Sequence, residues 1–265
     1  MEEKGVWIGA AVATLALAAA VYFLYIRDDS PPPPARPRPV AAEPMDAAPE
    51  VQNPLPEGPV DATAPPLPPL GQSDPTVRQD LGSVFGERAV DELVVPQGVI
   101  RRFVISVDGL ARKKLPVQSR PLASTGGAFR VAGTEEELTL DPQNYDRYKP
   151  VVALIRDTDT ERLASMYRRY YPLMQEAYAD IDREGAYFND RMVAVIDHLL
   201  ATPDVQGPIK LTQPRVFYEF ADPELEALSS GQKTLIRMGP ENAAVVKAKL
   251  REVRKVIASQ TPPAN

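Results

Sequence analysis

Residues 158–181 read TDTERLASMYRRYYPLMQEAYADI, and this stretch decides the fold class. Thr158 and Glu161 have the spacing of a capping box, in which each side chain bonds to the backbone of the other residue and so starts a helix. Pro172 removes one backbone donor inside the stretch, which predicts a kink. Apolar and aromatic side chains recur every three or four residues on one stripe: Leu163, Tyr167, Tyr170, Met174, Tyr178 and Ile181. The pattern predicts a long amphipathic helix.

Helix signals continue on both sides of this stretch, over residues 71–260. Residues 99–112 repeat apolar side chains at helical spacing, and a shorter helix is expected over 89–94. Asn189 or Asp190 is expected to cap a helix that ends before Thr202-Pro203. Other helix starts are predicted where a capping residue, a proline or both occur: Asp74-Pro75, Asp141-Pro142, Asp222-Pro223, Ser229 or Ser230, and Gly239-Pro240. Residues 71–260 are therefore predicted to form one mainly α-helical domain.

Two regions of this domain favour short β-strands instead. Residues 129–131 and 138–140 alternate apolar and polar side chains, and Gly133 and Thr134 lie between them. Short alternating runs around a glycine turn are typical of a β-hairpin. Residues Ile209 to Thr212 are a further candidate strand. The predicted fold is therefore mainly α, with a small β-hairpin.

A disordered, proline-rich linker is predicted over residues 27–70, because 15 of the 29 prolines lie between Pro31 and Pro69. This composition buries too little apolar surface to fold and favours extended polyproline II. At ~3.1 Å per residue, about forty residues in that conformation reach roughly 120 Å. The linker is either a plain spacer or, through its PxxP patterns, a ligand for a proline-reading groove.

Residues 6–26, VWIGAAVATLALAAAVYFLYI, contain no charge. A helix of this length matches a hydrocarbon core of roughly 30 Å, and Trp7, Tyr22 and Tyr25 are placed for the two membrane interfaces. The alternative is a signal peptide cleaved near residues 18–20, but the apolar run continues beyond a typical signal core. We expect a single-pass anchor in the lipid bilayer after a short tail at residues 1–5, and a loose tail at 261–265.

Different features of the sequence predict opposite orientations of this anchor in the membrane. Lys4 precedes the helix, whereas Arg27, Arg36 and Arg38 follow it, so the positive-inside rule alone would place the C-terminal domain in the cytoplasm. The short N-terminal tail and the long linker favour the opposite arrangement. We expect the C-terminal domain to lie outside the cytoplasmic membrane.

Charge and cysteine content exclude several classes of protein. Nine acidic and four basic residues precede Gly71, and 27 acidic and 26 basic residues make up the rest of the chain. A domain this close to neutral, without a long basic run, is not expected to bind nucleic acid, because that affinity comes from neutralising phosphates. The chain has no cysteine, which excludes disulfides, thiolate nucleophiles and cysteine-ligated zinc.

A family resemblance is carried by several phrases of the sequence: LPPLGQSD (67–74), VIRRFVISVDGLAR (99–112), LDPQNYDRY (140–148), YFNDRMVAVIDHLLATP (187–203) and the run from Gln213 to Glu252. In these phrases the chain resembles a bacterial membrane-anchored family known as domain of unknown function 3014. The resemblance implies an inner-membrane helix, a variable proline-rich linker and a helical domain in a bacterial envelope, which we expect in the periplasm. It implies no catalytic residues.

No catalytic constellation, metal site or cofactor site can be recognised in the sequence. His198 is the single histidine, and Asp197 beside it points about 100° away on a helix, so it cannot orient the imidazole as a general base. One histidine without cysteine is too few for a typical zinc site. Glycosidase chemistry needs only two facing carboxylates, for which candidates are available: Asp190, Asp197, Glu219 and Glu224.

Tyrosines and arginines form the most informative candidate site. Eight of the ten tyrosines lie between Tyr145 and Tyr218, with arginines interleaved. Tyrosine combines a large apolar area with a polar hydroxyl, and suits both a recognition surface and a core interface. Tyr171 lies about 100° round the helix from Tyr170 and is expected on a different face. The candidate binding residues are Arg168, Tyr171, Tyr187, Arg191, Arg215 and Tyr218.

These features favour a membrane-anchored, non-enzymatic envelope protein whose tethered helical domain binds a partner protein or the cell wall. The alternative is an anchored hydrolase that acts on cell-wall glycan or peptide. A glycan hydrolase needs two carboxylates that face one cleft at about 5 to 9.5 Å, whereas a binding domain needs an aromatic or basic groove. The positions of the carboxylates and tyrosines in the fold therefore bear on the choice.

Overall fold

The computed structural model of the protein describes residues 51–58, 65–114, 119, 121–122, 128–134, 137–181 and 183–258. Within these ranges, no helix combines the length and the apolar character that crossing a membrane requires. The expected membrane helix at 6–26, the tails at 1–5 and 261–265, and linker residues 27–50 lie outside the described residues.

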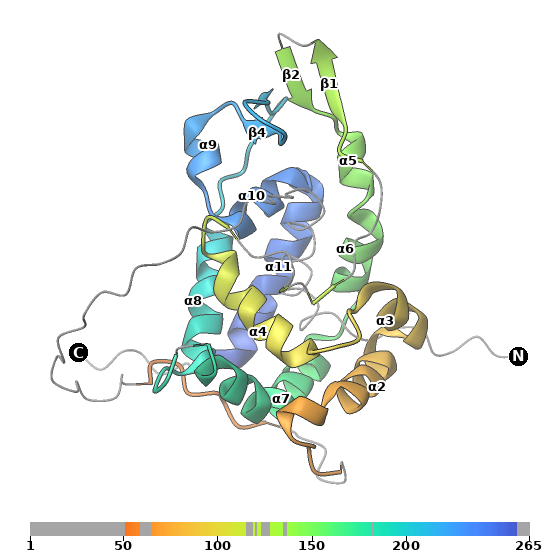
Figure 1. The fold of residues 1–265 in the computed structure, drawn as a ribbon, viewed down its shortest axis with the longest axis vertical. Helices are drawn as coiled ribbons and strands as arrows, with labels where there is room; N and C mark the ends of the chain where they lie inside the picture. The colour runs from red at the N-terminus through yellow and green to blue at the C-terminus, as the bar shows by residue number, and fades with distance from the viewer. Residues whose placement is uncertain are drawn as a thin grey trace, which may run out of the picture.

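The described residues form a mainly helical domain with two short β-sheets at one end (Figure 1). In chain order the elements are η1 (Leu70–Gln72), α2 (Asp74–Phe85), α3 (Glu87–Leu93), α4 (Val99–Leu110), β1 (Val131–Thr134), β2 (Glu137–Leu140), α5 (Gln143–Asp146), α6 (Lys149–Arg156), α7 (Thr160–Ala179), α8 (Phe188–Leu200), β3 (Leu211–Thr212), β4 (Glu219–Phe220), α9 (Pro223–Ala227), α10 (Ser230–Arg237) and α11 (Pro240–Ile257). This architecture confirms the prediction of a mainly α-helical C-terminal domain with a small β-hairpin.

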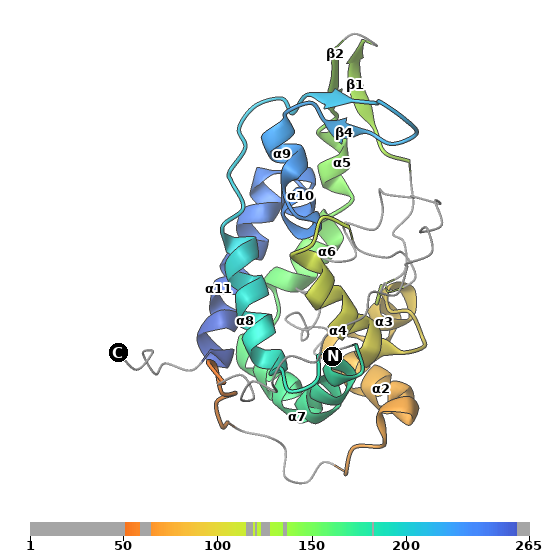
Figure 2. The same ribbon diagram turned by 60° about the vertical axis from the view of Figure 1, so that its left-hand side comes forward.

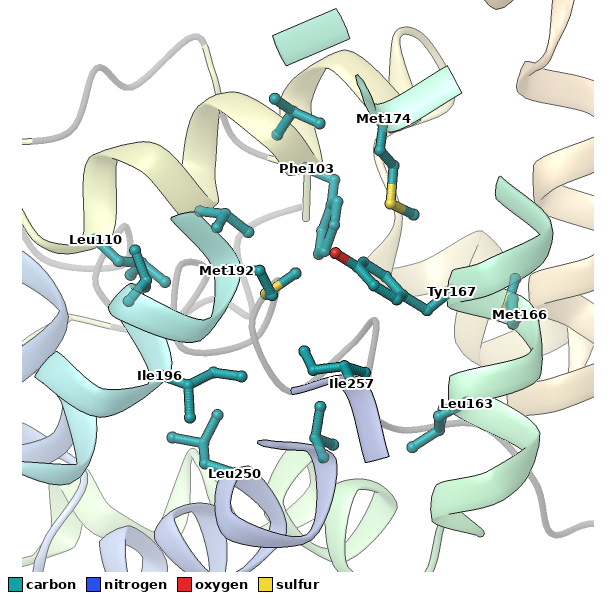
Figure 3. Close-up of a cluster of buried hydrophobic side chains, with 14 of the residues drawn as sticks. Phe103, Leu110, Leu163, Met166, Tyr167, Met174, Met192, Ile196, Leu250 and Ile257 are labelled. Carbon is teal, nitrogen blue, oxygen red and sulfur yellow. The ribbon is translucent and has the colours of Figure 1, made fainter. Parts of the chain in front are cut away.

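The main hydrophobic core lies where α4, α7, α8 and α11 meet. Figure 3 shows side chains from these helices converging, with the Tyr167 ring extending from α7 toward Phe103 of α4. Helix α2 packs against α3 and α4 on one flank, while α6 and α10 pack against α11. Burying one large apolar side chain stabilises the fold by roughly 1.5–3 kcal/mol. Side chains of this kind in the core include Phe103, Leu110, Leu163, Met174, Met192, Ile196, Leu250 and Ile257.

Helix α7 is the long helix predicted from residues 158–181, and its apolar stripe faces the core as expected. The predicted capping box at Thr158 is wrong. The cap is Asp159, whose side chain accepts a bond from the N–H of Arg162 at 2.8 Å. The Thr158 hydroxyl instead donates to the carbonyl of Leu154 at 2.7 Å, and so closes the end of α6. The helix continues through Pro172.

Helix α8 begins at Phe188, earlier than the predicted caps, and Tyr187 precedes it without a side-chain cap. The prediction that Asn189 or Asp190 caps this helix is therefore wrong. Both residues lie in its first turn, and their side chains bond to residues far away along the chain. The predicted end before Thr202 is confirmed, because the helix stops at Leu200.

Asp74 also serves a different helix from the one predicted. It is the first residue of α2, and its carboxylate accepts bonds from the N–H groups of Gly98 and Val99 at 2.8 and 2.9 Å. Asp74 therefore caps α4, because these donors belong to the start of that helix. The predicted caps Asp222 and Ser229 are confirmed, since each accepts a backbone N–H bond at the start of α9 or α10.

The predicted β-hairpin is confirmed, although its first strand begins at Val131 rather than Phe129. Val131 lies opposite Leu140, and Thr134 lies opposite Glu137. Gly133 has a φ of 94°, and a Cβ at this position would lie 2.1 Å from a backbone carbonyl oxygen. Only glycine therefore fits this point of the hairpin.

A second, two-stranded sheet joins this hairpin to the chain before α9. Leu211 pairs with Phe220, so only the last two residues of the predicted strand 209–212 belong to a strand. The N–H of Leu140 donates to the carbonyl of Ile209 at 2.9 Å and links the two sheets. A small second core forms beneath them, and its buried residues are Leu140, Ile209, Leu211, Phe220 and Ile236. Figure 2 shows both sheets at the end of the molecule opposite α2 and α7.

Candidate functional site

Residues 51–58, which belong to the predicted linker, pack against the first turn of α8; we call them the docked segment. They contain no helix or strand, and they run past the α7 end of the molecule as an orange trace in Figure 1. The backbone N–H groups of Gln52 and Asn53 donate to the Asp190 carboxylate at 3.1 and 2.5 Å. The domain therefore holds this segment by its main chain, through bonds that charge on the acceptor strengthens.

A second anchoring point follows two residues later. The N–H of Leu55 donates to the Tyr187 hydroxyl at 3.0 Å, and the Leu55 side chain packs against the main core. The surface that receives the docked segment is called the docking surface here, and it consists of Arg168, Tyr171, Tyr187, Asn189 and Asp190.

Asn189 joins the docked segment to three helices. Its side-chain amide donates to the carbonyl of Asn53 at 2.9 Å and to the carbonyl of Ile257, at the end of α11, at 2.8 Å. Its side-chain oxygen accepts a bond from the Tyr167 hydroxyl of α7 at 3.0 Å. Asn189 is 0% exposed, so all of these bonds replace water that the side chain has lost.

The tyrosine rings beneath the segment stack on one another. The Tyr171 ring lies 5.7 Å from the Tyr167 ring and 5.5 Å from the Tyr187 ring, centroid to centroid. The Tyr171 hydroxyl donates to Gln175 at 2.9 Å and accepts a bond from the N–H of Asn189 at 3.3 Å. Burial raises the pKa of both Tyr167 and Tyr171. Both hydroxyls are therefore protonated donors at neutral pH.

Arg168 lies under the far end of the docked segment. Its side chain is 9% exposed, and a carboxylate oxygen of Glu161 lies 4.0 Å from Nη2. In the described part of the chain, Nε and Nη1 of this guanidinium have no hydrogen-bond partner. The backbone of Gly58 lies directly against it, because a Cβ built on Gly58 would fall 2.5 Å from Cζ of Arg168. A buried cation whose one carboxylate neighbour is 4.0 Å away and mostly exposed is costly, so Arg168 stands out among the residues of this surface.

Comparison with known families matches the model described as "Protein of unknown function (DUF3014)" to residues 99–254, which is more than half of the chain. The protein belongs to this family. Curated proteins and solved structures give no significant match. The DUF3014 match contains every residue of the docking surface, whereas the docked segment precedes it.

One predicted site residue of the DUF3014 domain, Arg191, is directed toward α4. Its Nε donates to the Asp108 carboxylate at 2.8 Å, and its Nη2 donates to the Asp108 carbonyl at 2.7 Å. Asp108 is buried, and Arg112 and Arg183 also face its carboxylate. Arg191 therefore helps to neutralise a buried charge and ties α8 to α4.

The last two predicted site residues lie at the opposite end of the DUF3014 domain. Arg215 is exposed in the β3–β4 connection. Tyr218 is half-buried, and its ring packs 5.6 Å from the Phe129 ring. The structure therefore brings together Arg168, Tyr171 and Tyr187, and it leaves Arg215 and Tyr218 in the connection between β3 and β4.

Three groups of the docking site escaped prediction from the sequence. Asn189 was expected only as a helix cap, Asp190 was expected as a cap or as a candidate catalytic carboxylate, and residues 51–58 were expected only as linker. Asn53 is the one asparagine among residues 27–70, whereas leucine occurs at positions 55, 67 and 70. The composition of the linker therefore gives little sign that residues 51–58 differ from the rest.

His198 and Asp197, which were both considered for catalysis, have structural partners. His198 Nε2 lies 2.8 Å from the Ser229 hydroxyl, but that hydroxyl also caps α10 by accepting a bond from the N–H of Gln232. Burial, followed by the charge of Arg191, lowers the pKa of His198. Asp197 binds Arg254 at 2.5 Å instead of the imidazole.

The described residues offer little else that a ligand could use. Among them, no three histidine, aspartate or glutamate side chains lie close enough to hold a metal ion. A cavity beside the end of α8 and the start of α11 has a volume of about 20 Å³, which is room for about one water molecule. The docking surface is therefore the strongest candidate site in the described part of the chain.

Proposed function

We propose that this protein is a membrane-anchored, non-enzymatic envelope protein whose tethered helical domain binds a protein or cell-wall partner through the docking surface. The observation that carries the proposal is the docked segment. A length of proline-containing chain gives its backbone N–H groups to the Asp190 carboxylate and to the hydroxyl of Tyr187, whose ring stacks on that of Tyr171. A surface that holds its own linker in this way has the chemistry to hold another peptide.

The composition of the surface supports recognition. Stacked tyrosines supply a rigid, amphipathic contact area at low cost in side-chain entropy, and tyrosine and arginine are enriched where partners bind tightly. Asp190 and Tyr187 read backbone amides, so they fix the course of a bound chain whatever its side chains are. Specificity then falls to the groups next to them, above all Arg168.

The same contacts favour binding over hydrolysis. Asp190 accepts two backbone bonds, and Asp197 pairs with Arg254. The pair formed by His198 and Ser229 serves the start of α10. These roles account for His198, Asp190 and Asp197. The other two candidate carboxylates are Glu219, half-buried on β4, and Glu224, exposed on α9, and no contact among the described residues specifically favours hydrolysis.

The anchor and the location belong to the proposal as well. Residues 6–26 supply the inner-membrane helix, and the periplasm is the proposed location of the domain. The protein should remain in the membrane pellet through alkaline carbonate washing with its N-terminus intact. Protease added to spheroplasts should release the folded domain; protection until the membrane is broken would place it in the cytoplasm instead.

Partner binding is tested by photo-crosslinking in living cells from a probe at Pro172. This residue is exposed on α7, one turn beyond Arg168. The matched control carries the probe at Val216, which is 76% exposed near β4 at the other end of the domain. A defined crosslinked species from position 172 and none from position 216 supports the proposal. Equal capture from both positions, or none from either, refutes it.

A further inference from the structure

Arg168 is the one feature of the docking surface that the docked segment leaves unsatisfied. Arginine keeps its charge at every physiological pH and offers five N–H donors in a planar fork that matches a carboxylate. Here the side chain is 9% exposed, and two of its three nitrogens have no hydrogen-bond partner in the described part of the chain. Glu161 comes only within 4.0 Å of the third nitrogen and is itself 67% exposed.

The docked segment leaves these two nitrogens without an anion. Its one acidic residue, Glu57, is exposed, and Gly58 next to the guanidinium has no side chain. A Cβ at position 58 would lie 2.5 Å from Cζ and 2.8 Å from Nε and Nη1 of Arg168. A side chain there therefore points straight at the unsatisfied donors. Such a Cβ would overlap the guanidinium, so the flexible end of the arginine side chain has to move aside before a short acidic side chain here can form a paired, charge-assisted contact with it.

We propose that the docking surface recognises a proline-containing protein segment that carries a carboxylate against Arg168, and that residues 51–58 occupy this surface as an exchangeable stand-in. The proposal rests on the proposed binding function and names its ligand. Backbone N–H groups of the ligand face Asp190 and Tyr187, as those of the docked segment do. The carboxylate of the ligand lies where Gly58 of the docked segment lies, and its contact with Arg168 gives the ligand a higher affinity for the docking surface than the docked segment has.

The stand-in can be exchanged because it is held strongly by proximity and weakly by contact. Only residues 59–64 separate the docked segment from Pro65, whose carbonyl accepts a bond from Arg169 at 3.1 Å. A short connection gives an effective concentration in the millimolar range. The segment itself is half-buried or exposed throughout. A ligand that also pairs with Arg168 can therefore compete in spite of this proximity, whereas a peptide that merely copies the segment cannot compete well.

The absence of cysteine from the chain allows a direct test. A nitroxide spin label on Val51→Cys, at the exposed start of the docked segment, reports by electron paramagnetic resonance whether the segment is bound or free in the full-length protein in detergent. The probes are synthetic peptides of residues 51–58 with Gly58→Asp or with the neutral, nearly isosteric Gly58→Asn. We expect the Asp peptide to release the label at a concentration at least about tenfold lower than the Asn peptide, since charge-assisted bonds are roughly twice as strong as neutral ones.

Two protein variants separate the parts of the proposal. Arg168→Gln should abolish the difference between the two peptides. Leu55→Pro removes the N–H that binds Tyr187 but leaves the docking surface intact, so its label should be mobile without peptide and gives the signal expected of a released segment. Should Arg168→Gln fail to fold, the comparison of the two peptides on the unchanged surface still decides.

Each outcome has a distinct meaning. Equal potency of the Asp and Asn peptides, or a label that stays immobile at saturating peptide, overturns the acidic ligand and the exchange. Crosslinking from Pro172 that persists in that case leaves the proposed function standing. If Arg168 discriminates between the Asp and Asn peptides but no partner is crosslinked in cells, the preference for an acidic ligand stands and the proposed function is overturned.

Discussion

Replacing Asn189 by Asp is the sharpest test of how the docked segment, α7 and α11 are joined. The substitution keeps the shape of the side chain and its acceptor for the Tyr167 hydroxyl, but it converts a donor of two hydrogen bonds into a second acceptor. The carbonyls of Asn53 and Ile257, bonded at 2.9 and 2.8 Å, would then face an oxygen. Each orphaned acceptor costs about 1–3 kcal/mol, so losing both bonds should lower the free energy of unfolding by about 2–6 kcal/mol.

The pH dependence of this loss gives a second check. A carboxyl at a site that is 0% exposed has a raised pKa, because burial disfavours its charged form. Its protonated form restores one donor, so the introduced carboxyl is tolerated below its folded pKa and destabilises the fold as the pH rises through it. The deficit relative to the unchanged protein should therefore be larger at about pH 8 than at about pH 5.

The measurement is urea unfolding followed by far-ultraviolet circular dichroism, with Tyr167→Phe as the matched control. That control removes the 3.0 Å bond to the Asn189 oxygen and leaves both amide donors in place. It should cost about 1–3 kcal/mol, because it orphans one buried acceptor. A loss for Asn189→Asp within about 1 kcal/mol of the unchanged protein, or a smaller loss than that of the control, would refute the assigned role of Asn189.

Three further predictions concern other parts of the domain. Tyr170→Ala should lower the free energy of unfolding by about 3–5 kcal/mol, because the side chain is 1% exposed. Tyr170→Phe should cost only about 1–2 kcal/mol, since Asp80 loses the 2.6 Å bond to the hydroxyl but keeps its ion pair with Arg169. Calorimetric melting of the two variants compares these losses. Gly231→Ala should cost about 1–3 kcal/mol, because the added Cβ would lie 2.5 Å from Leu199 and 3.0 Å from a backbone carbonyl, and the open position Gly71 provides the control. His198 has a lowered pKa in the folded protein, so as the pH falls the unfolded chain binds a proton at this residue first. The contribution of His198 to stability is complete above about pH 6.5, and the free energy of unfolding should fall below that pH more steeply than in His198→Gln. Urea titrations at several pH values that give the same pH dependence for both proteins would contradict this.

The helices could be predicted where the signals act within a few residues. Ser229 and Asp222 cap the helices that immediately follow them, because a cap binds an N–H two or three positions later. Asp74 and Asp190 have the same side chain and a similar place beside a helix start, yet they bind backbone amides 24 and 138 positions away. Which amide such a carboxylate captures depends on the packed fold, which the spacing of residues along the chain does not encode.

The candidate site was predictable in part for the same reason. The helical repeat places Arg168 and Tyr171 on one side of α7, and Tyr187 stacks on Tyr171 in the structure. Arg191 and Tyr218 are of the same residue types as Arg168, Tyr171 and Tyr187, but they have different neighbours in the fold. Tertiary packing places Arg191 against Asp108 and Tyr218 against Phe129. The residue types therefore predicted a surface of tyrosines and arginines, whereas long-range contacts in the fold determine which of these residues belong to it.

The docked segment also determines how far the domain can stand from its proposed anchor. While residues 51–58 are bound, only residues 27–50 span the distance from the membrane helix, which is roughly 75 Å if fully extended as polyproline II. Release adds the segment and the connection to Pro65, and the limit becomes roughly 120 Å. Partner binding at the docking surface would thus be coupled to the distance that the domain can cover: a domain without its ligand stays close to the membrane, and a domain that has exchanged its own segment for a ligand can reach about half as far again.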